Sequence, residues 1–512
     1  MPRRPADAAD LTVAVVGAGA MGRGIAQVAA TGGARVLLHD TRPGAAAEAR
    51  DFVANMLSRA AAKGRMTEAA AAEATALITP AETLAELAPA DVVIEAIVED
   101  IAAKQALFAE LEGIVAADAI LASNTSSLSI TRIAAGCAKP GRVAGFHFFN
   151  PVPLMPLVEV IAGIRTAPAI VDELVTLGAR MGRTPVRVAD APGFLVNQVG
   201  RGYTVEATHL VAEGVADFVT IDRIMRQAAG FRMGPFELLD LTALDVTHPA
   251  TVEIYEQTFH EPRFRPATLM DQRRQAGLLG RKTGAGHYTY TDGKPEVPDE
   301  APLPAFDGGS FWIDPSRPKV AAALAGIVQA AGGTVDGGAQ PGPDSVLLVA
   351  PLGEDASACA VAQGLDATRL VAVDPLFGFA GRRSMMGTPV TDPAVLTRAQ
   401  AMLGADGTPV AVLRDSPGFV AQRIIACIIN IASQVASRGI AAPQDIDRAV
   451  TLGLNYPHGP LAWADALGPQ RVLTILEGVQ GCTGDPRYRP DPWLRRRAQL
   501  GVSMLTPDSR PA

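Results

Sequence analysis

Short apolar runs alternate with helix-like segments from the start of the chain to about Asp190, and this pattern predicts a sheet covered by helices. Each run is apolar along most of its length instead of alternating with polar residues, so both faces of the sheet should be buried, as in parallel α/β sheets. Residues 25–30, between the first two runs, are predicted as part of a helix. The predicted strands are Val13–Val16, Arg35–His39, Val92–Ile97, Ile120–Ser123, Val143–Phe148 and Leu157–Ile161.

Beyond Pro192 the pattern becomes helical, and Asn197–Glu213 is its clearest helix. The segment Gly293–Pro304 is rich in proline and acids, which is typical of a linker. Weaker strand signals return at Val346–Ala350 and Leu370–Val373, and the chain is helical again from about residue 415.

The second half partly repeats the first. Asp190-Ala-Pro-Gly-Phe194 matches Asp415-Ser-Pro-Gly-Phe419, and two further matches, Ile-Asp-Arg at 221 and 446 and Gly-Pro at 234 and 459, are separated by the same distance along the chain. One such match arises easily by chance, but three at a constant offset indicate a duplicated helical domain.

A glycine-rich loop follows the first predicted strand and opens the first predicted helix. In a Gly-x-Gly-x-x-Gly loop the first glycine allows the turn, the second lets a pyrophosphate approach the backbone, and the third lets helix and strand pack closely. The helix N-terminus favours the negative charge. The loop therefore predicts a dinucleotide site formed by Gly17, Ala18, Gly19, Ala20, Met21 and Gly22.

Asp40 ends the next predicted strand, at the spacing from the loop where dinucleotide-binding folds carry an acid. An acid at this position binds the ribose hydroxyls of NAD and repels the 2′-phosphate of NADP. We therefore expect NAD as the cofactor. Arg42 leaves NADP open as the alternative, because a cation there could bind the 2′-phosphate.

These observations predict a five-part organisation. An α/β Rossmann-like NAD-binding domain is followed by an all-α domain, a linker, a degenerate α/β Rossmann-like segment and a second copy of the all-α domain. The predicted bounds are 1–190, 191–290, 291–318, 319–412 and 413–512.

Three polar groups lie at or beside predicted strands. The run Ser123–Ser127 follows one strand, His147 lies near the end of another, and Glu159 lies within a third. Ligands of open α/β sheets bind beyond the carboxyl ends of the strands. A carboxylate such as Glu159 could fix the tautomer of His147 for acid–base work. The spacing equally allows a core histidine bonded to the backbone.

Four runs follow one another along the chain: GAGAMGRGIAQVAA, SNTSSLSI, GFHFFNPVPLMPLVEVI and DAPGFLVNQ. In order and spacing, throughout Leu11–Tyr290 and so over half of the chain, they resemble the 3-hydroxyacyl-CoA dehydrogenase family. The resemblance implies a Rossmann-like domain with a helical domain, and NAD-dependent oxidation of the 3-hydroxyl of an acyl-CoA. It leaves the acyl chain open between 3-hydroxybutyryl-CoA and 3-hydroxyadipyl-CoA, in fatty acid or phenylacetate breakdown.

The resemblance also implies roles for individual residues. His147 would be the acid/base and Glu159 its orienting partner, while Ser126 and Asn197 would bond the reacting oxygen. Lys63 would meet the coenzyme A phosphates. The dinucleotide would be contacted by Glu99, Lys104, Asn150 and Lys282. Taken without the resemblance, Lys63 and Lys104 would be solvated helix lysines.

The chain departs from the family at one site position. The family usually has arginine directly after the asparagine, whereas here Gln198 follows Asn197. The second copy has Gln422-Arg423 at the matching pair, so it keeps the arginine and loses the asparagine. This departure puts in doubt the salt bridge that the arginine normally makes.

The second half is predicted to be structural. Alignment of Arg142–His147 with Arg369–Asp374 puts an aspartate where the histidine stood, and no Gly-x-Gly-x-x-Gly precedes this copy. Single-copy relatives pair their helical domains between two subunits, so the duplicated domain could supply that pairing within one chain. The predicted helix Gln422–Ser437 carries the apolar run Ile424–Ile431, which requires burial on more than one side. Further homo-oligomerisation stays open.

Bulk properties narrow the function classes. The net charge of −8 is spread without a long basic run, which argues against nucleic acid as a partner. The four cysteines, Cys137, Cys359, Cys427 and Cys482, form no metal-ligand cluster and are expected to be reduced, packed thiols of a cytoplasmic protein. Neither a signal peptide nor a membrane span is expected.

Three other functions are possible for a chain with this fold, and the sequence argues against each. A short-chain dehydrogenase would use a lysine base, which the run around His147 argues against. A non-catalytic dinucleotide-binding regulator or structural protein would not need Ser126, His147, Glu159 and Asn197 together. A fused enoyl-CoA hydratase is not expected, because no stretch is left for a domain of that size.

Overall fold

The computed structural model of the chain describes residues 3–509, which form two compact units. One unit contains the described residues up to 198 together with 438–454, and the other contains 199–437 and 455–509. Helix α7 (Val196–Ala212) begins in the first unit and continues into the second.

The first unit is built on an eight-stranded sheet with the order β3-β2-β1-β4-β5-β6-β7-β8. Its strands are β1 (Thr12–Val16), β2 (Arg35–His39), β3 (Ile78–Ala81), β4 (Val92–Glu95), β5 (Ile120–Ser123), β6 (Val143–Phe148), β7 (Leu157–Ala162) and β8 (Thr184–Ala189). Its helices are α1 (Ala20–Thr31), α2 (Ala45–Ala62), α3 (Glu68–Ala76), α4 (Ile101–Ile114), α5 (Ile130–Ala134), α6 (Pro168–Arg180) and α16 (Pro443–Leu454), with short 3-10 turns at Leu84–Leu87 and Pro140–Arg142. The six predicted strands are confirmed, although the one predicted to end at Ile97 ends at Glu95.

The sheet is parallel except between β6 and β7, which pair antiparallel. The predicted parallel sheet is therefore confirmed except at this pair, where it is wrong. Parallel neighbours need a crossover of a dozen or more residues, and only residues 149–156 join these two strands. The reversal places His147 directly opposite Glu159 in the strand register.

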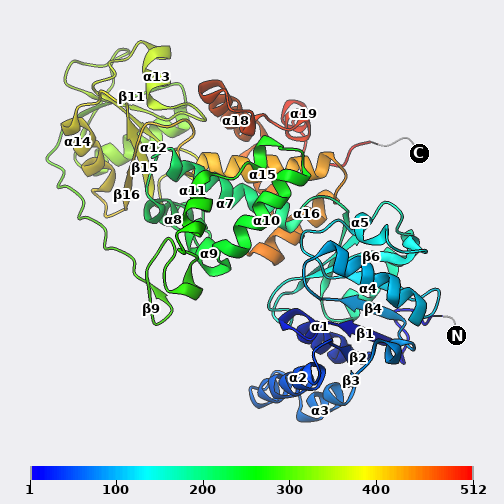
Figure 1. Ribbon diagram of the computed structural model, residues 1–512. Helices are drawn as coiled ribbons and strands as arrows, with labels where there is room; N and C mark the ends of the chain where they lie inside the picture. The colour runs from blue at the N-terminus through cyan, green and yellow to red at the C-terminus, as the bar shows by residue number, and fades with distance from the viewer. Residues whose placement is uncertain (1–2, 510–512) are drawn as a thin grey trace. The chain divides into compact units, whose positions relative to one another are not determined.

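The second unit contains a helical part from the first half of the chain and a second sheet. The helical part consists of the rest of α7 with α8 (Phe218–Gln227), α9 (Pro235–Thr242), α10 (Leu244–Gln257) and α11 (Thr268–Gln275), the 3-10 turns η3 (Pro262–Phe264) and η4 (Arg281–Thr283), and the hairpin β9 (Tyr290–Thr291) and β10 (Lys294–Pro295). Figure 1 shows these elements in green.

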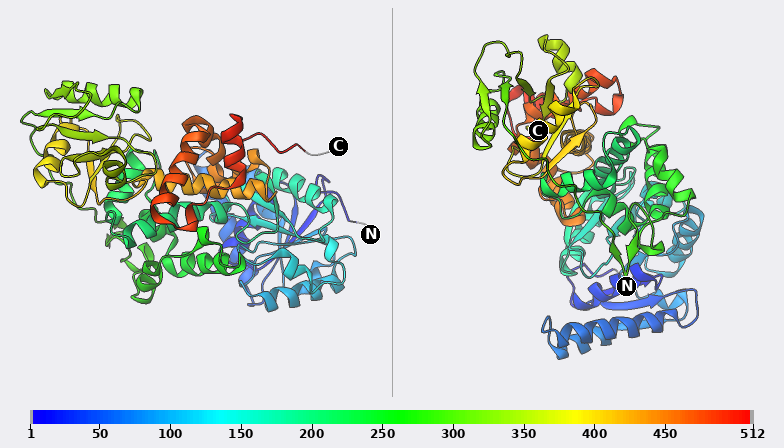
Figure 2. Two further views of the ribbon diagram at one scale, coloured as in Figure 1. Left: turned by 90° about the horizontal axis from the view of Figure 1, so that it is seen from above. Right: turned by 90° about the vertical axis from the view of Figure 1, so that its left-hand side faces the viewer.

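The second sheet has six strands in the order β12-β11-β13-β14-β15-β16. They are β11 (Ser310–Ile313), β12 (Thr334–Asp336), β13 (Val346–Val349), β14 (Leu370–Val373), β15 (Arg383–Gly387) and β16 (Val410–Leu413). The helices α12 (Pro318–Ala330), α13 (Ala356–Gln363) and α14 (Pro393–Gly404) flank this sheet in the views of Figure 2. The predicted linker 291–318 ends too late, because β11 already belongs to the sheet.

The second sheet repeats part of the first. From β13 to β16 the neighbours pair parallel, antiparallel and parallel, as they do from β5 to β8. Arg142 donates to the carbonyls of Ala116 and Ala119 just before β5, and Arg369 donates to those of Gly342 and Ser345 just before β13. The sequence alignment that pairs these two arginines therefore has a structural counterpart.

The C-terminal helices complete the second unit: α15 (Ala421–Ser437), α17 (Pro460–Leu467), α18 (Pro469–Thr483) and α19 (Pro492–Leu500), with the 3-10 turn η5 (Pro486–Tyr488). Residues 421–436 of α15 are all buried, so the predicted burial of its apolar run is confirmed. Helices α7 and α15 touch closely, because a Cβ added at Gly202 would lie 2.8 Å from the Cα of Ile428.

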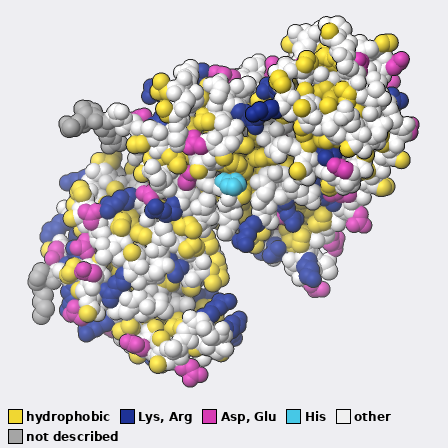
Figure 3. Space-filling model, turned by 180° about the vertical axis from the view of Figure 1, so that it is seen from behind, with side chains coloured by type: hydrophobic (Ala, Val, Ile, Leu, Met, Phe, Trp, Pro, Cys, Tyr) yellow, Lys and Arg dark blue, Asp and Glu magenta, His cyan; other side chains and the backbone are white. Residues whose placement is uncertain are grey.

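Several bulk expectations can be compared with the structure. All four cysteines are free, but Cys482 is exposed, so the expectation of four packed thiols is wrong for this residue. Within residues 3–509 no helix is long and apolar enough to cross a membrane. On the face shown in Figure 3, cationic and anionic side chains are interspersed. The same residues contain no His/Cys/Asp/Glu group that could hold a metal ion.

Candidate active site

The glycine loop between β1 and α1 has the stereochemistry that its motif predicts. Gly17 has a φ of 102°, and a Cβ there would lie 2.5 Å from the carbonyl oxygen of Ala96. A Cβ on Gly22 would lie 1.7 Å from the carbonyl oxygen of Gly17, so only glycine fits. Beside Gly19, in contrast, no atom lies within 4 Å. The loop is closed where strand and helix meet and open where a phosphate would approach.

Asp40 is fixed against this loop at the end of β2. Its Oδ2 accepts the N–H of Ala18 at 2.7 Å, and its Oδ1 accepts the N–H of Arg42 at 2.9 Å. The Arg42 guanidinium turns instead to Glu48, with an N–O distance of 2.6 Å. A carboxylate beside the loop, with the neighbouring cation already paired, suits a free ribose 2′-hydroxyl better than a phosphate.

The imidazole of His147 is bonded to the carboxylate of Glu159. Nδ1 and Oε2 are 2.7 Å apart, and both side chains are buried. The other carboxylate oxygen accepts the N–H groups of Leu195 at 3.2 Å and Val196 at 2.9 Å. Because Glu159 accepts three hydrogen bonds, Nδ1 must carry the proton in the neutral ring, which leaves the lone pair on Nε2. The alternative of a core histidine bonded to the backbone is wrong.

The first turn of α7 brings the remaining predicted side chains to this pair. Val196 starts the helix beside Glu159, and the next residue, Asn197, donates from Nδ2 to the carbonyl of Ser126 at 3.3 Å. Ser126 is exposed in the loop after β5. Strand pairing thus joins His147 to Glu159, and the helix start links Glu159 to the loop of Ser126 through Val196 and Asn197.

Glu99 shapes the loop that carries Ser126. One of its oxygens accepts the hydroxyl of Thr125 at 2.5 Å and the N–H groups of Ser126 and Ser127 at 3.0 and 3.2 Å. Burial raises the pKa of Glu99, but hydrogen bonds from the loop, chiefly from the Thr125 hydroxyl, and the ammonium of Lys104 together lower it by more. The pKa is therefore below its ordinary value. The carboxylate is therefore held charged within the loop.

Lys104 is buried between two carboxylates, which neither interpretation of the sequence anticipated. Its Nζ lies 2.6 Å from Glu95 and 3.3 Å from Glu99, and its side chain is 1% exposed. The second oxygen of Glu95 accepts the Ser123 hydroxyl at 2.6 Å. Lys104 is therefore neither a solvated lysine nor an amine exposed to a ligand, and it contacts Glu99 instead.

Sequence reasoning assigned no role to two polar residues that hold this region together. Glu95 is wholly buried, and the only sequence signal was an acid at the end of an apolar run with a lysine nine residues later. Asn124 accepts the N–H of Phe148 at 2.8 Å, so it ties the serine loop to the end of β6.

The other three predicted contacts take no part in this cluster of hydrogen bonds. Asn150 is exposed just after β6, and Lys63 is exposed at the C-terminal end of α2. Lys282 lies on η4 in the second unit, where its ammonium is paired with Asp245. Their ligand contacts remain predictions.

The equivalent position in the second half is closed. Asp374 follows β14 and accepts from Nε2 of Gln422 at 2.8 Å, while Oε1 of Gln422 accepts the N–H of Gly353. Burial raises the pKa of Asp374 to about 6. This pair replaces the histidine and asparagine of the first half, and it leaves no imidazole for acid–base work.

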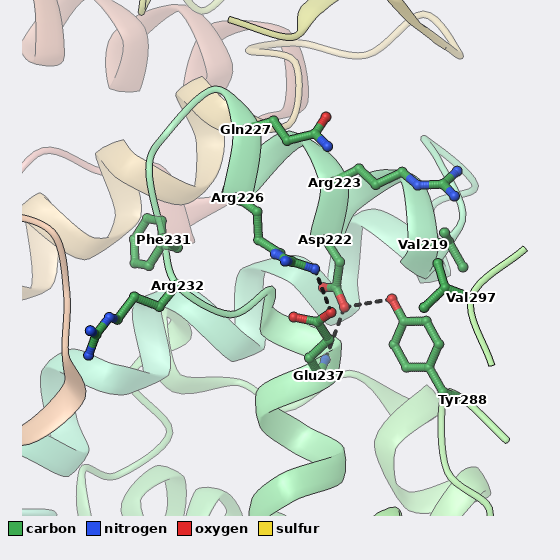
Figure 4. Close-up of a pocket in the computed structure, with 10 residues that line it drawn as sticks. All are labelled: Val219, Asp222, Arg223, Arg226, Gln227, Phe231, Arg232, Glu237, Tyr288 and Val297. Carbon is green, nitrogen blue, oxygen red and sulfur yellow. Dashed lines mark hydrogen bonds and ion pairs between the residues drawn. The ribbon is translucent and has the colours of Figure 1, made fainter. Parts of the chain in front are cut away.

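A separate cavity of about 310 Å³ lies between α8, α9 and the segment around Tyr288. At its centre, Asp222 accepts the hydroxyl of Tyr288 at 2.7 Å and the N–H of Glu237 at 3.0 Å (Figure 4). Figure 4 shows the side chains of Arg223 and Arg232 pointing away from each other. The cations do not converge on one point, so the cavity lacks the form of an anion site.

Comparison with known proteins agrees with this geometry. The family model described as the NAD-binding domain of 3-hydroxyacyl-CoA dehydrogenase matches residues 12–191, and the model of the C-terminal domain matches 193–290 and again 418–505. The chain belongs to the 3-hydroxyacyl-CoA dehydrogenase family.

Individual relatives fall into two lengths. The chain is 39% identical to 3-hydroxyadipyl-CoA dehydrogenase of Escherichia coli K12, over 96% of this chain and 98% of that protein. It is 42% identical to a probable 3-hydroxybutyryl-CoA dehydrogenase of Bacillus subtilis, over 55% of this chain and 97% of that protein. A crystal structure of 3-hydroxybutyryl-CoA dehydrogenase from Escherichia coli K12 aligns with a TM-score of 0.84 at 37% identity, covering 96% and 98% of the two chains.

Proposed function

We propose that this protein catalyses the reversible, NAD-dependent oxidation of a (3S)-3-hydroxyacyl-CoA to the 3-oxoacyl-CoA. The observation that carries the proposal is the buried hydrogen bond of 2.7 Å between His147 and Glu159, adjacent to the helix turn that presents Asn197. A protein that only bound a dinucleotide would have no use for an oriented imidazole there.

His147 acts as the acid/base. Its Nε2 removes the proton of the 3-hydroxyl. NAD, held by the glycine loop and Asp40, would supply the acceptor for the hydride of C3. Glu159 holds Nδ1 protonated and stabilises the imidazolium that results. Ser126 and Asn197 donate hydrogen bonds to the reacting oxygen and stabilise the charge that develops on it.

The glycine loop and Asp40 hold the dinucleotide. Gly17–Gly22 provides the open approach for the pyrophosphate, and Asp40 binds the ribose hydroxyls. Glu99 and Asn150 contact the cofactor in this proposal, and the contact expected of Lys282 stays a prediction. Lys104 acts through Glu99, because its ammonium is buried against that carboxylate.

The substrate is a short-chain acyl-CoA whose phosphates meet Lys63. The two relatives named above are called after 3-hydroxyadipyl-CoA and 3-hydroxybutyryl-CoA, and these names support an acyl group of similar size. A panel of C4, C6 and C8 3-hydroxyacyl-CoA thioesters with the C6 dicarboxylate distinguishes these substrates by kcat/KM.

The assay follows the absorbance of NADH after mixing the protein with NAD and each thioester. Turnover with the (3S) thioester and none with the (3R) form supports the proposal. Tight NAD binding without turnover on any member of the panel would instead support a non-catalytic binding protein.

We further propose that the two helical copies form a pseudo-dimer within one chain. Two ion pairs support this, Arg265 with Asp485 at 2.6 Å and Arg489 with Glu261 at 3.5 Å. The runs Glu-Pro-Arg-Phe-Arg at 261–265 and Asp-Pro-Arg-Tyr-Arg at 485–489 are equivalent, so the second pair is the first with the copies exchanged. Such reciprocity is the mark of a two-fold interface.

A further inference from the structure

A cluster of ion pairs joins α15 to α7, and its members are buried except Glu213, whose side chain is 39% exposed. Arg423 of α15 is 1% exposed and lies 2.6 Å from both Glu206 and Glu213. Arg487 reaches the same two acids at 3.3 and 3.2 Å, and the hydroxyl of Tyr488 donates to Glu206 at 2.7 Å. The two acids are seven residues apart and so face the same side: Glu206 lies within α7, and Glu213 directly follows its last residue.

The cluster is ionised. Burial raises the pKa of Glu206, but Arg423 and Arg487 lower it to a net value of about 2. A buried pair of this kind is costly to break on one side only, because the remaining charge is left without a partner. Removing one partner of the cluster should therefore disturb the contact between α7 and α15.

The repeat shows that the equivalent positions on the other side carry no such cluster. At the constant offset between the two copies, the counterpart of Arg423 is Gln198, and the counterparts of Glu206 and Glu213 are Ile431 and Arg438. Neither counterpart position therefore offers an acid to an arginine at position 198. The missing family arginine thus coincides with the loss of its acid partners.

The two copies differ in what their helices carry. Helix α7 begins with Val196 and Asn197, which meet Glu159 and the loop of Ser126. The corresponding helix α15 carries Gln422 at the equivalent position, bonded to Asp374. The ion-pair cluster is present on α7, the helix that carries Asn197. The equivalent positions of α15, the helix that carries Gln422, form no such cluster.

We propose that Arg423, from the half without an acid/base histidine, is a positioning residue that holds α7 so that Asn197 meets the reacting oxygen. The inference rests on the proposed function. Glu206 is nine residues beyond Asn197, about 14 Å along a rigid helix, so a shift at the cluster is transmitted to the first turn.

The test uses the full-length protein with three single variants. Arg423→Gln places the residue of position 198 in the cluster, Arg423→Lys keeps the charge, and Arg265→Gln is the matched control. The Arg265 guanidinium pairs with Asp485 across the same two copies. Only its backbone carbonyl, which the substitution leaves in place, meets α7, at His209. Wild-type turnover is measured first, because its absence refutes the proposed function and not the positioning role.

We expect Arg423→Gln to lower kcat by about 10- to 100-fold while the KM for NAD stays within about two-fold, since a displacement of about 1 Å has such an effect on the chemical step. Arg423→Lys should recover much of the loss, and Arg265→Gln should keep the wild-type kcat. All rates are measured at a temperature where circular dichroism shows each variant folded. An Arg423→Gln variant that is less heat-stable but turns over like the wild type refutes the inference.

A double-mutant cycle with Asn197→Ala tests the route. If Arg423 acts through Asn197, its removal costs much less in the Asn197→Ala background, and full multiplicativity of the two effects refutes the inference. If Arg423→Gln does not fold, the double variant Arg423→Gln/Glu206→Ile replaces it. This variant copies the chain's own pair at Gln198 and Ile431, leaves no unpaired acid at 206, and should show the same fall in kcat.

Discussion

The substitution Glu159→Gln tests the mechanism most sharply, because the carboxylate serves two sides at once. One oxygen accepts the Nδ1 proton of His147 at 2.7 Å, and the other accepts two backbone N–H groups at 3.2 and 2.9 Å. A glutamine amide has one oxygen and one NH₂ group. It can satisfy either the imidazole or the helix start, but not both.

Each orientation of the amide has a definite cost. With its oxygen toward the backbone, the NH₂ group faces Nδ1, and the ring must take the tautomer that carries its proton on Nε2, which cannot accept the substrate proton. With its oxygen toward the ring, two buried N–H groups face an NH₂ group, at about 1–3 kcal/mol each. The first orientation is the cheaper, so the catalytic tautomer is lost in most molecules.

We expect kcat for oxidation to fall by about 10²-fold, corresponding to about 2.7 kcal/mol of transition-state stabilisation, with NAD affinity nearly unchanged. Stopped-flow single-turnover kinetics isolates the chemical step, and fluorescence titration gives the NAD affinity. Glu159→Asp is the control that keeps the charge but shortens the reach. A Glu159→Gln protein with the wild-type single-turnover rate would remove this residue from the mechanism.

Four further results follow from the same structure. His147→Gln should lower turnover by about 10²–10⁴-fold with NAD binding retained, since it removes the acid/base itself. The wild type should prefer NAD to NADP in kcat/KM, and Asp40→Ser should lose that preference, because the repelling carboxylate is gone. The pKa of Glu206 is lowered to about 2 in the folded protein, from about 4.5 in the unfolded chain. Its charge therefore stabilises the fold fully above pH 4.5. The free energy of unfolding should fall by on the order of 3 kcal/mol as the pH drops from there toward 2. Truncation after Tyr290 should yield a protein that dimerises or becomes insoluble, because the face that α15 covers is exposed.

Each of these has a measurement that can contradict it. Wild-type turnover in His147→Gln, with chemistry rate-limiting, would remove the histidine. A wild-type preference for NADP would contradict the role of Asp40 and would indicate that Arg42 binds the 2′-phosphate. The free energy of unfolding, measured with urea between pH 5 and 2, should fall more steeply with pH in the wild type than in Arg423→Gln/Glu206→Ile. Equal slopes would show that Glu206 does not cause the acid sensitivity. A truncated chain that is monomeric, soluble and fully active would end the pseudo-dimer proposal.

The fold was predictable where its signals are local. A strand that is buried on both faces is apolar along its length, and a loop that needs φ of 102° and no Cβ has to be glycine, so the order of residues alone predicts β1, the loop and α1. The antiparallel return of β7 was equally readable in principle, because eight intervening residues cannot form a crossover.

The candidate site was predictable as a set of residue types but not as a set of contacts. The sequence places His147 and Glu159 twelve residues apart, yet their bond depends on a register in which the two face each other across neighbouring strands. The burial of Lys104 between Glu95 and Glu99 could not be predicted from the sequence. A lysine on a helix is normally solvated, and only the packing of α4 buries this one.

The missing arginine at position 198 shows how far a single sequence can be read once a repeat supplies a second copy of each position. By itself Gln198 was an unexplained departure from the family. The contact of Arg423 with Glu206, residues 217 positions apart, identifies what such an arginine binds. The repeat then shows that the acid for Gln198 would have stood at position 431, where the chain has isoleucine. A buried arginine without an acid is destabilising, so loss of the acid makes loss of the arginine favourable, and the two substitutions are one event in physical terms.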